Sequence, residues 1–226
     1  MPVLNEADGL EASVRALDGL DLQEIVIIDG GSTDATLVIA QRLALVADPA
    51  VPVRVGQSAA GRARQMNRGA SGALADVLLF LHADTSLPPA AVDSIRAAIR
   101  GGRTWGRFDV RLDGQRAMFR GIERLMNVRS AVTGIATGDQ AMFVLRDTFT
   151  LLGGFAPLPL MEDIDLSRRL KWTGAPAILR TPVVTSARRW RAGGVGRTVL
   201  RMWALRLLYS LGVAPARLAR FYHHGR

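Results

Sequence analysis

The sequence contains no cysteine and only three histidines. Without cysteine, the protein has neither disulfides nor metal sites built from thiolates. Two of the three histidines, His223 and His224, lie at the very end of the chain, which disfavours a zinc site rich in histidine. A catalytic metal would therefore be held mainly by oxygen atoms, and this favours Mg²⁺ or Mn²⁺.

Acidic residues are missing from the last part of the chain. Residues 188–226 carry nine arginines and no acid, whereas residues 1–187 carry 20 basic and 20 acidic side chains, so the tail holds the whole net charge of +9. Its arginines alternate with apolar residues, as in a helix at an anionic membrane surface rather than a nucleic-acid-binding segment. The alternative is a helix docked on the core with its arginines reaching into solvent.

Long apolar runs are also missing. No uncharged stretch approaches the roughly 20 residues of a membrane-spanning helix, and the N-terminus has no signal peptide. We therefore expect a cytoplasmic protein that can bind the inner face of the membrane peripherally, with no nucleic-acid partner. Residues 1–4 resemble the end of a strand whose beginning is missing, so we expect a longer natural chain.

The hydrophobic content of 49% is sufficient for a sizeable core. Strands predicted at 24–29, 51–55 and 77–81 alternate with helices at 10–17, 36–47, 61–73 and 88–100, a pattern typical of a parallel, doubly wound sheet. The later segments are mixed: strands at 105–112 (antiparallel in character), 141–145 and 177–181, and a helix at 160–172. We predict an α/β domain over 1–190, followed by a basic helical tail at 191–226. The domain would have a nucleotide-binding half (1–100) and an acceptor half (101–190).

Asp84 follows the apolar strand that ends at Leu81. In open α/β sheets, ligands bind just outside the carboxyl ends of the strands, so Asp84 stands where a metal or a phosphate would be handled. An aspartate in this place can equally be a helix cap.

Polar residues follow the other predicted strands in the same way. They are Asn5 and Glu6, then Asp29 with Ser32 and Asp34, and later the pair Glu162 and Asp163 before a helix. Each could be a cap or a dipole-stabilising acid, most clearly Asp34. The arginine-rich helix start at 61–67 suits phosphates, whereas the carboxylates suit ribose hydroxyls and a divalent ion. Together they predict a nucleoside-diphosphate site.

Six segments in this order resemble those of family 2 glycosyltransferases of the GT-A fold. They are 2–6, 27–36, 61–69, 82–84, 153–155 and 162–163. The resemblance covers roughly residues 1–190. Segments 61–67 and 186–190 further resemble a small bacterial subgroup that is linked to arsenosugar biosynthesis.

The resemblance implies roles for these residues. Pro2, Glu6 and Asp29 would line the nucleoside pocket, with Asp29 facing the base, and Arg62 and Asn67 would lie near the base or the diphosphate. The other candidate donor contacts are Asn5, Ser32, Asp34 and His82. Asp84 matches the last acid of the family's Asp-x-Asp metal motif. His82 stands where the first acid is usual, and a contact with ribose, metal ligation and simple packing all remain open for it.

The resemblance also implies the chemistry. Asp163 matches the catalytic base and Glu162 its companion, while residues 138–140 would fall near the acceptor. An inverting hexosyl transfer from a nucleoside-diphosphate sugar, most commonly a UDP-sugar, would use Asp163 to take the acceptor proton. A Mn²⁺ or Mg²⁺ ion on Asp84 would act as a Lewis acid on the leaving diphosphate.

Other functions fit parts of the sequence. A non-catalytic sugar-nucleotide-binding protein or membrane adaptor could retain the fold, and a nucleotidyltransferase would share the binding half. A Rossmann oxidoreductase is excluded because the turn at 30–32 does not supply the G-x-G-x-x-G spacing.

Overall fold

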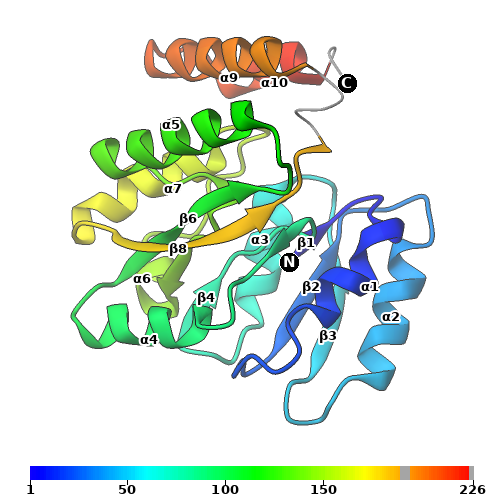
Figure 1. Ribbon diagram of the computed structural model, residues 1–226. Helices are drawn as coiled ribbons and strands as arrows, with labels where there is room; N and C mark the ends of the chain where they lie inside the picture. The colour runs from blue at the N-terminus through cyan, green and yellow to red at the C-terminus, as the bar shows by residue number, and fades with distance from the viewer. Residues whose placement is uncertain (189–193, 224–226) are drawn as a thin grey trace.

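The first half of the chain forms a parallel sheet. The computed structural model describes residues 1–188 and 194–223. Strands β1 (Pro2–Val3), β2 (Ile25–Asp29) and β3 (Val53–Gln57) pair in parallel in the order β1-β2-β3. Helices α1 (Ala7–Arg15) and α2 (Thr36–Val46) cover one face, and α3 (Arg62–Ser71) covers the other (Figure 1). This parallel αβ alternation confirms the sequence prediction, with shifts of a few residues at the element ends.

The second sheet is mixed. Its strands are β4 (Val77–Leu79), β5 (Thr85–Ser86), β6 (Trp105–Leu112), β7 (Phe143–Leu145) and β8 (Ala177–Thr185), in the order β4-β7-β6-β8-β5. Strand β6 runs parallel to β8 and antiparallel to β7, and β4 pairs antiparallel with β7 instead of extending the parallel run. An apolar run predicts a buried strand, but it carries no information about the strand's neighbour or direction.

Helices cover both faces of this second sheet. Helix α4 (Ala91–Arg100) lies on one face, and α5 (Ala117–Thr133) and α7 (Glu162–Leu170) lie on the other (Figure 1). Shorter elements complete it: α6 (Arg146–Leu151) and the 3-10 helices η1 (Gly138–Gln140) and η2 (Lys171–Thr173). The sequence did not predict α5. Its exposed face carries Met118, Leu125, Val128 and Val132, so apolar residues surround the helix and no single stripe marks it.

An aromatic cluster fixes the loop before α7. The rings of Phe80 and Phe155 lie 4.9 Å apart, and that of Phe149 lies 5.2 Å from Phe80 and 5.5 Å from Phe155. Such pairs contribute about 0.5–1.5 kcal/mol each beyond area burial. The cluster therefore joins β4 and α6 to the glycine-rich segment 153–155.

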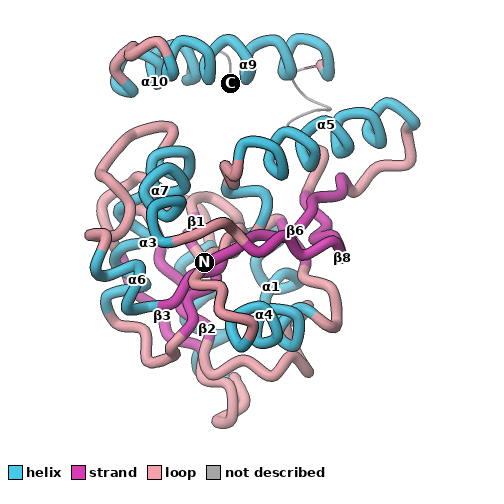
Figure 2. The backbone as a smooth tube through the Cα atoms, turned by 90° about the vertical axis from the view of Figure 1, so that its left-hand side faces the viewer, coloured by secondary structure: helices cyan, strands magenta, loops and turns pink. Residues whose placement is uncertain are grey.

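The tail is helical and docks on the core. Helices α9 (Val195–Ser210) and α10 (Pro215–His223) lie over α5 and α7 (Figures 1 and 2). Leu205 and Leu218 are buried against Leu160, Met161 and Ile164, at the start of α7. The opposite face leaves large apolar side chains exposed: Leu200, Trp203, Leu207, Leu211 and Phe221. Within 1–188 and 194–223, every helix is too short or too polar to cross a membrane.

Candidate active site

The loops after β1 and β2 form one hydrogen-bonded unit. The buried Asp29 carboxylate accepts hydrogen bonds from the backbone N–H of Gly31 (2.9 Å) and Ser32 (3.1 Å), and from the Ser32 hydroxyl. Ser32 Oγ in turn accepts the N–H of Asn5 (2.9 Å), and Asn5 Oδ1 accepts the N–H of Thr33 (2.8 Å). Three of the predicted donor contacts therefore lie together at the carboxyl end of the parallel sheet.

Asp34 supports this hydrogen-bonded unit through contacts with the backbone. Its carboxylate accepts the N–H of Thr36 (2.9 Å) and of Ala7 (3.3 Å), and Thr36 Oγ1 accepts the N–H of Glu6 (2.8 Å). The bond from the Thr36 hydroxyl is the main reason why the pKa of Asp34 lies below its usual range. Asp34 thus joins the starts of α1 and α2, which is the structural alternative that its sequence context allowed.

Gln65 is a buried residue to which the sequence assigned no role. From α3, its Nε2 donates to the carbonyls of Val3 (2.8 Å) and Ile28 (2.9 Å). A Cβ atom at Gly30 would lie 2.9 Å from the Gln65 amide carbon, so a larger residue there would displace this amide. Gln65 therefore sets the spacing between α3 and the ends of β1 and β2. The only sequence signal for it is its place inside the 61–67 motif.

Asn67 is also engaged by the backbone. Its Nδ2 donates to the Phe155 carbonyl (2.8 Å), and its Oδ1 accepts the Phe155 N–H (2.9 Å). The amide therefore binds the loop at 153–155, and donor contact by Asn67 stays a prediction.

We expect Asn67→Ala to lower stability by about 1–3 kcal/mol, because two paired backbone groups lose their partner. For a chain of this size, each kcal/mol shifts Tm by roughly 2–4 °C. Thermal denaturation followed by circular dichroism measures the shift. The matched control is Arg68→Ala, the next and exposed residue of α3, and equal Tm values for the two variants would refute the assignment.

His82 and Asp84 end the segment after β4. The imidazole is mostly buried, and its Nδ1 lies 3.6 Å from Asp139 Oδ1. The η1 backbone lies on the ring so closely that a Cβ at Gly138 would fall 2.5 Å from His82 Cε1. Asp84 is exposed, and its closest side-chain partner within the described residues is Thr85 Oγ1, at 3.5 Å.

The acidic pair stands at the first turn of α7. Asp163 Oδ2 accepts the N–H of Gly138 (2.9 Å), and Oδ1 accepts the N–H of Ile164 (2.8 Å). The buried Glu162 pairs with Arg62 Nε at 3.2 Å, which brings the first residues of α3 and α7 together. The two halves of the predicted site therefore meet at this ion pair.

A small pocket of about 40 Å³ lies at this junction. Its lining includes Arg62, Gly138, Asp139, Asp163 and Arg206. A larger pocket of about 150 Å³ between β2, α3 and β4 is mostly apolar and contains none of the predicted catalytic or metal residues. The chemistry-bearing side chains therefore mark the smaller pocket as the site.

Backbone strain gathers around the same region. Within the described residues, three non-glycine residues have positive φ: Asn5 (55°), Ala141 (44°) and Met161 (69°). Each such conformation costs about 1–3 kcal/mol and persists where the surroundings enforce it, often at functional sites. Asn5 is itself a predicted donor contact, Ala141 follows η1, and Met161 precedes the acidic pair.

Arg188 binds Glu6 and interacts electrostatically with Asp84. Its Nη2 lies 3.0 and 3.1 Å from the two carboxylate oxygens of Glu6, and this bond raises the pKa of the Arg188 guanidinium. The sequence placed Arg188 in a recognisable segment without assigning it a role. Two further members of that segment, 189 and 190, lie outside the described residues.

The environment of Glu162 predicts a pH dependence of stability. Burial, followed by the neighbouring Asp163 charge, raises the pKa of Glu162 above its usual 4.5, while Arg62 opposes the shift. The folded protein then keeps this proton to a higher pH than the unfolded chain does. Stability from this group is therefore greatest below pH 4.5 and is lost as pH rises through the raised native pKa.

We expect Glu162→Gln to remove this loss. Its unfolding free energy relative to wild type should rise as the pH increases from 4.5 through the raised pKa of Glu162. Urea unfolding across this range measures the difference, with Asp165→Asn on the same helix as control. A wild-type pH profile in Glu162→Gln would contradict the prediction.

Asp84 offers a cation one exposed carboxylate and no preformed set of protein ligands. Within the described part of the chain, no cluster of three or more His, Asp or Glu could hold an ion by itself. Mg²⁺ is typically bound by one or two carboxylates together with substrate phosphates. The exposed Asp84 carboxylate suits this partial role.

Comparisons with known proteins identify a matching family. The family model described as "Glycosyl transferase family 2" matches residues 1–152. A search of curated proteins gives no match.

Solved structures share the fold. The mannosyltransferase PcManGT from Pyrobaculum calidifontis, in complex with GDP-Man and Mn²⁺, is 21% identical with a TM-score of 0.66, covering 98% of this chain and 66% of that one. S. aureus TarS 1–349 is 16% identical with a TM-score of 0.65, covering 92% of this chain and 64% of that one. Its UDP-GlcNAc complex has a TM-score of 0.65 and 16% identity over 83% of this chain and 57% of that one.

The chain thus spans 66% or less of the length of these three neighbours. The mixed α/β architecture is that of the GT-A fold. With the family model matching more than half of the sequence, the chain belongs to glycosyl transferase family 2.

Proposed function

We propose that this protein is an inverting glycosyltransferase, which moves a sugar from a nucleoside-diphosphate donor to an acceptor hydroxyl. The observation that carries the proposal is the Arg62–Glu162 ion pair. It joins the phosphate-type helix start of α3 to the acidic first turn of α7, beside a pocket that contains Asp163.

The donor would lie across the carboxyl ends of β1 and β2. Pro2, Asn5, Glu6, Asp29 and Ser32 would form the nucleoside side, and Arg62 would face the diphosphate. Asn67 and Asp34 would act by holding the surrounding loops, as their hydrogen bonds suggest. A UDP-sugar is our first choice of donor. UDP-GlcNAc in the TarS complex supports this choice, and GDP-Man in the archaeal neighbour is the alternative.

Asp163 would act as the general base. Both of its oxygens accept backbone N–H bonds, which fix the carboxylate in the pocket. It takes the acceptor O–H proton while the oxygen attacks the anomeric carbon from the face opposite the diphosphate. The bond between that carbon and the diphosphate oxygen breaks, its electrons leave with the diphosphate, and the anomeric configuration inverts. A positioned base of this kind contributes typically about 10²–10⁴-fold to the rate.

A Mn²⁺ or Mg²⁺ ion bound by Asp84 and the donor phosphates would supply charge neutralisation of the leaving group. His82 lies beside the same strand end, where it contacts η1 through Asp139 and Gly138. We propose that His82 positions η1 against Asp163, because the Gly138 N–H binds that carboxylate.

The exposed face of the tail supports peripheral membrane binding. Trp203 and Leu207 are exposed on α9, and residues 194–223 contain arginines and no acid. Sedimentation with phosphatidylglycerol vesicles tests this. Trp203→Glu should weaken binding, whereas equal recovery of wild type and variant would refute it.

Release of nucleoside diphosphate from UDP-GlcNAc or GDP-Man in the presence of Mn²⁺ tests the catalytic proposal. A transferase should hydrolyse its donor slowly without acceptor. Donor binding without any turnover, with or without candidate acceptors, would favour the non-catalytic binder instead.

A further inference from the structure

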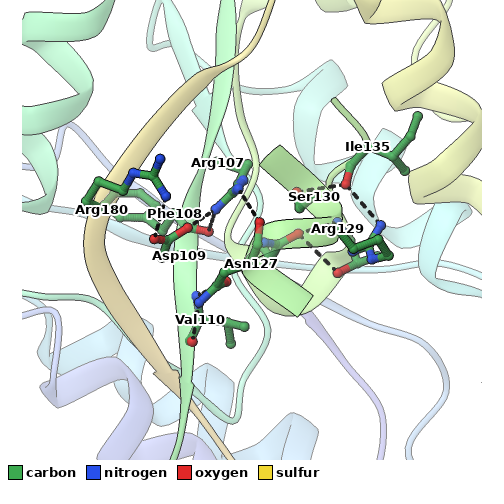
Figure 3. Close-up of polar contacts among 11 residues, drawn as sticks. Arg107, Phe108, Asp109, Val110, Asn127, Arg129, Ser130, Ile135 and Arg180 are labelled. Atoms are coloured by element: carbon green, nitrogen blue, oxygen red, sulfur yellow. Dashed lines mark hydrogen bonds and ion pairs between the residues drawn. The ribbon is translucent and has the colours of Figure 1, made fainter. Parts of the chain in front are cut away.

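Two partly buried arginines near Asp163 are incompletely paired. They are Arg129 on α5 and Arg206 on α9. Among the described residues, Arg129 Nε and Nη2 and Arg206 Nε are shielded from solvent and have no hydrogen-bond acceptor. Arg129 Nη1 donates to the Ile135 carbonyl at 3.3 Å (Figure 3), but this neutral group cannot balance the charge.

A third buried arginine shows how the same fold satisfies such a charge. Arg107 on β6 forms an ion pair with Asp109, and its guanidinium also donates to the carbonyls of Phe108 and Asn127, each at 3.2 Å (Figure 3). Arg129 and Arg206 have no carboxylate within 4 Å among the described residues. Nε of Arg107 also lacks an acceptor, so the contrast lies in the carboxylate partner that Arg107 has.

Burial of these charges lowers the pKa of both Arg129 and Arg206. Burial, together with the like charge of Arg206, lowers the pKa of Arg129 to about 10. Burial also lowers the pKa of Arg206, against the attraction of Asp163 and Asp139. Shielded charges without partners are strongly unfavourable, so two such cations that also repel each other suggest that an anion completes the site in the working protein.

The position of the two arginines indicates which molecule would carry that anion. Arg206 lines the same pocket as Asp163, and both arginines are close enough to interact with its charge. Arg62, the other arginine at this pocket, already pairs with Glu162. An acceptor must present its hydroxyl to Asp163, so Arg206 stands where the rest of the acceptor would lie. Arg129 does not line the pocket, and it acts on this site through its charge.

We propose that Arg129 and Arg206 form an oxyanion subsite, which binds a phosphate or carboxylate group carried by the acceptor. The planar guanidinium presents paired N–H donors that match these groups. The inference rests on the proposed function, since it names the chemical class of the acceptor. The donor's own diphosphate is the other source of the same chemistry, and the experiment separates the two.

The test is a calorimetric titration of the full chain with inorganic phosphate, with and without saturating UDP and Mn²⁺. We expect phosphate to bind in both conditions. Arg206→Gln and Arg129→Gln should each weaken this binding by about 10-fold or more, the effect of losing charge-assisted hydrogen bonds. Exposed arginines on the same helices provide the controls, Arg197→Gln for α9 and Arg124→Gln for α5, and should bind phosphate as wild type does.

Three results would overturn the proposal. These are equal phosphate affinity in all variants, no phosphate binding by wild type, and loss of binding when UDP is present, which would assign the arginines to the donor diphosphate. Repeating the titration with acetate separates carboxylate from phosphate preference. Thermal denaturation of each variant confirms folding, and Arg206→Lys, which keeps the charge but not the fork, should bind with intermediate affinity.

Failure of the proposed function would look different. Arginine-dependent phosphate binding without any turnover of a nucleotide sugar would leave the subsite in place and refute the transferase. Turnover of a nucleotide sugar, together with phosphate binding that is unchanged in both arginine variants, would support the transferase and refute the subsite.

Discussion

Replacing Asp163 by asparagine should lower kcat for sugar transfer by about 10²–10⁴-fold, the usual contribution of a positioned general base. The amide cannot take the acceptor proton. Its one remaining oxygen can still accept a backbone N–H, from Gly138 or Ile164. The fold, and with it the affinity for the donor nucleotide, should therefore change little. Steady-state kinetics with the identified donor and acceptor measures the effect.

The matched control is Asp165→Asn, two residues further along α7. Asp165 pairs with Arg169 (2.7 Å) on the helix surface and does not line the pocket. Its replacement should leave kcat within a factor of about 2, because surface ion pairs contribute little. Wild-type turnover by Asp163→Asn would remove Asp163 from the mechanism. Equal losses in both variants would point to disruption of α7 instead.

Replacing Asp84 by asparagine should raise the Mn²⁺ concentration needed for half-maximal activity. Even the loss of an outer-shell partner of a metal costs about 10–100-fold in affinity or activity, so loss of a direct carboxylate should cost at least this much. Chelation with EDTA should abolish wild-type activity, and added Mn²⁺ should restore it. The side chain is exposed and makes one long hydrogen bond, so Tm should stay close to wild type.

Asp76→Asn is the control for the metal experiment. Asp76 is an exposed acid just before β4, where it pairs with Arg146 at 3.3 Å. An unchanged Mn²⁺ requirement in Asp84→Asn would contradict the metal assignment. EDTA-resistant transfer by the wild type would contradict the need for a metal altogether.

Local patterns predicted the parts of the fold that local physics determines. The β-branched run in β2 and the glycine-opened α3 lie where expected, because strand and helix preferences act over a few neighbouring residues. Asn5, Asp29 and Ser32 were predicted to share one edge, and they do so because parallel strands end together. The antiparallel pairing of β4 with β7 depends on residues more than 60 positions apart, and no local signal specifies it.

The residues that the sequence left without roles are held by long-range contacts. Arg188 meets Glu6 across 182 residues of chain, and Gln65 reaches Val3 across 62. Arg129 lies on α5, which has no clear apolar stripe, and Arg206 was interpreted as one more charge of a basic tail. Only the docking of α9 on the start of α7 makes it a neighbour of Asp163.

Calorimetric titration with UDP-GlcNAc and GDP-Man, with and without Mn²⁺, tests the central claim most directly. We predict saturable binding of one nucleotide sugar per chain, strengthened by Mn²⁺ in the wild type but not in Asp84→Asn. A folded protein that binds neither of these, nor any member of a wider nucleotide-sugar panel, with or without Mn²⁺, would contradict the claim.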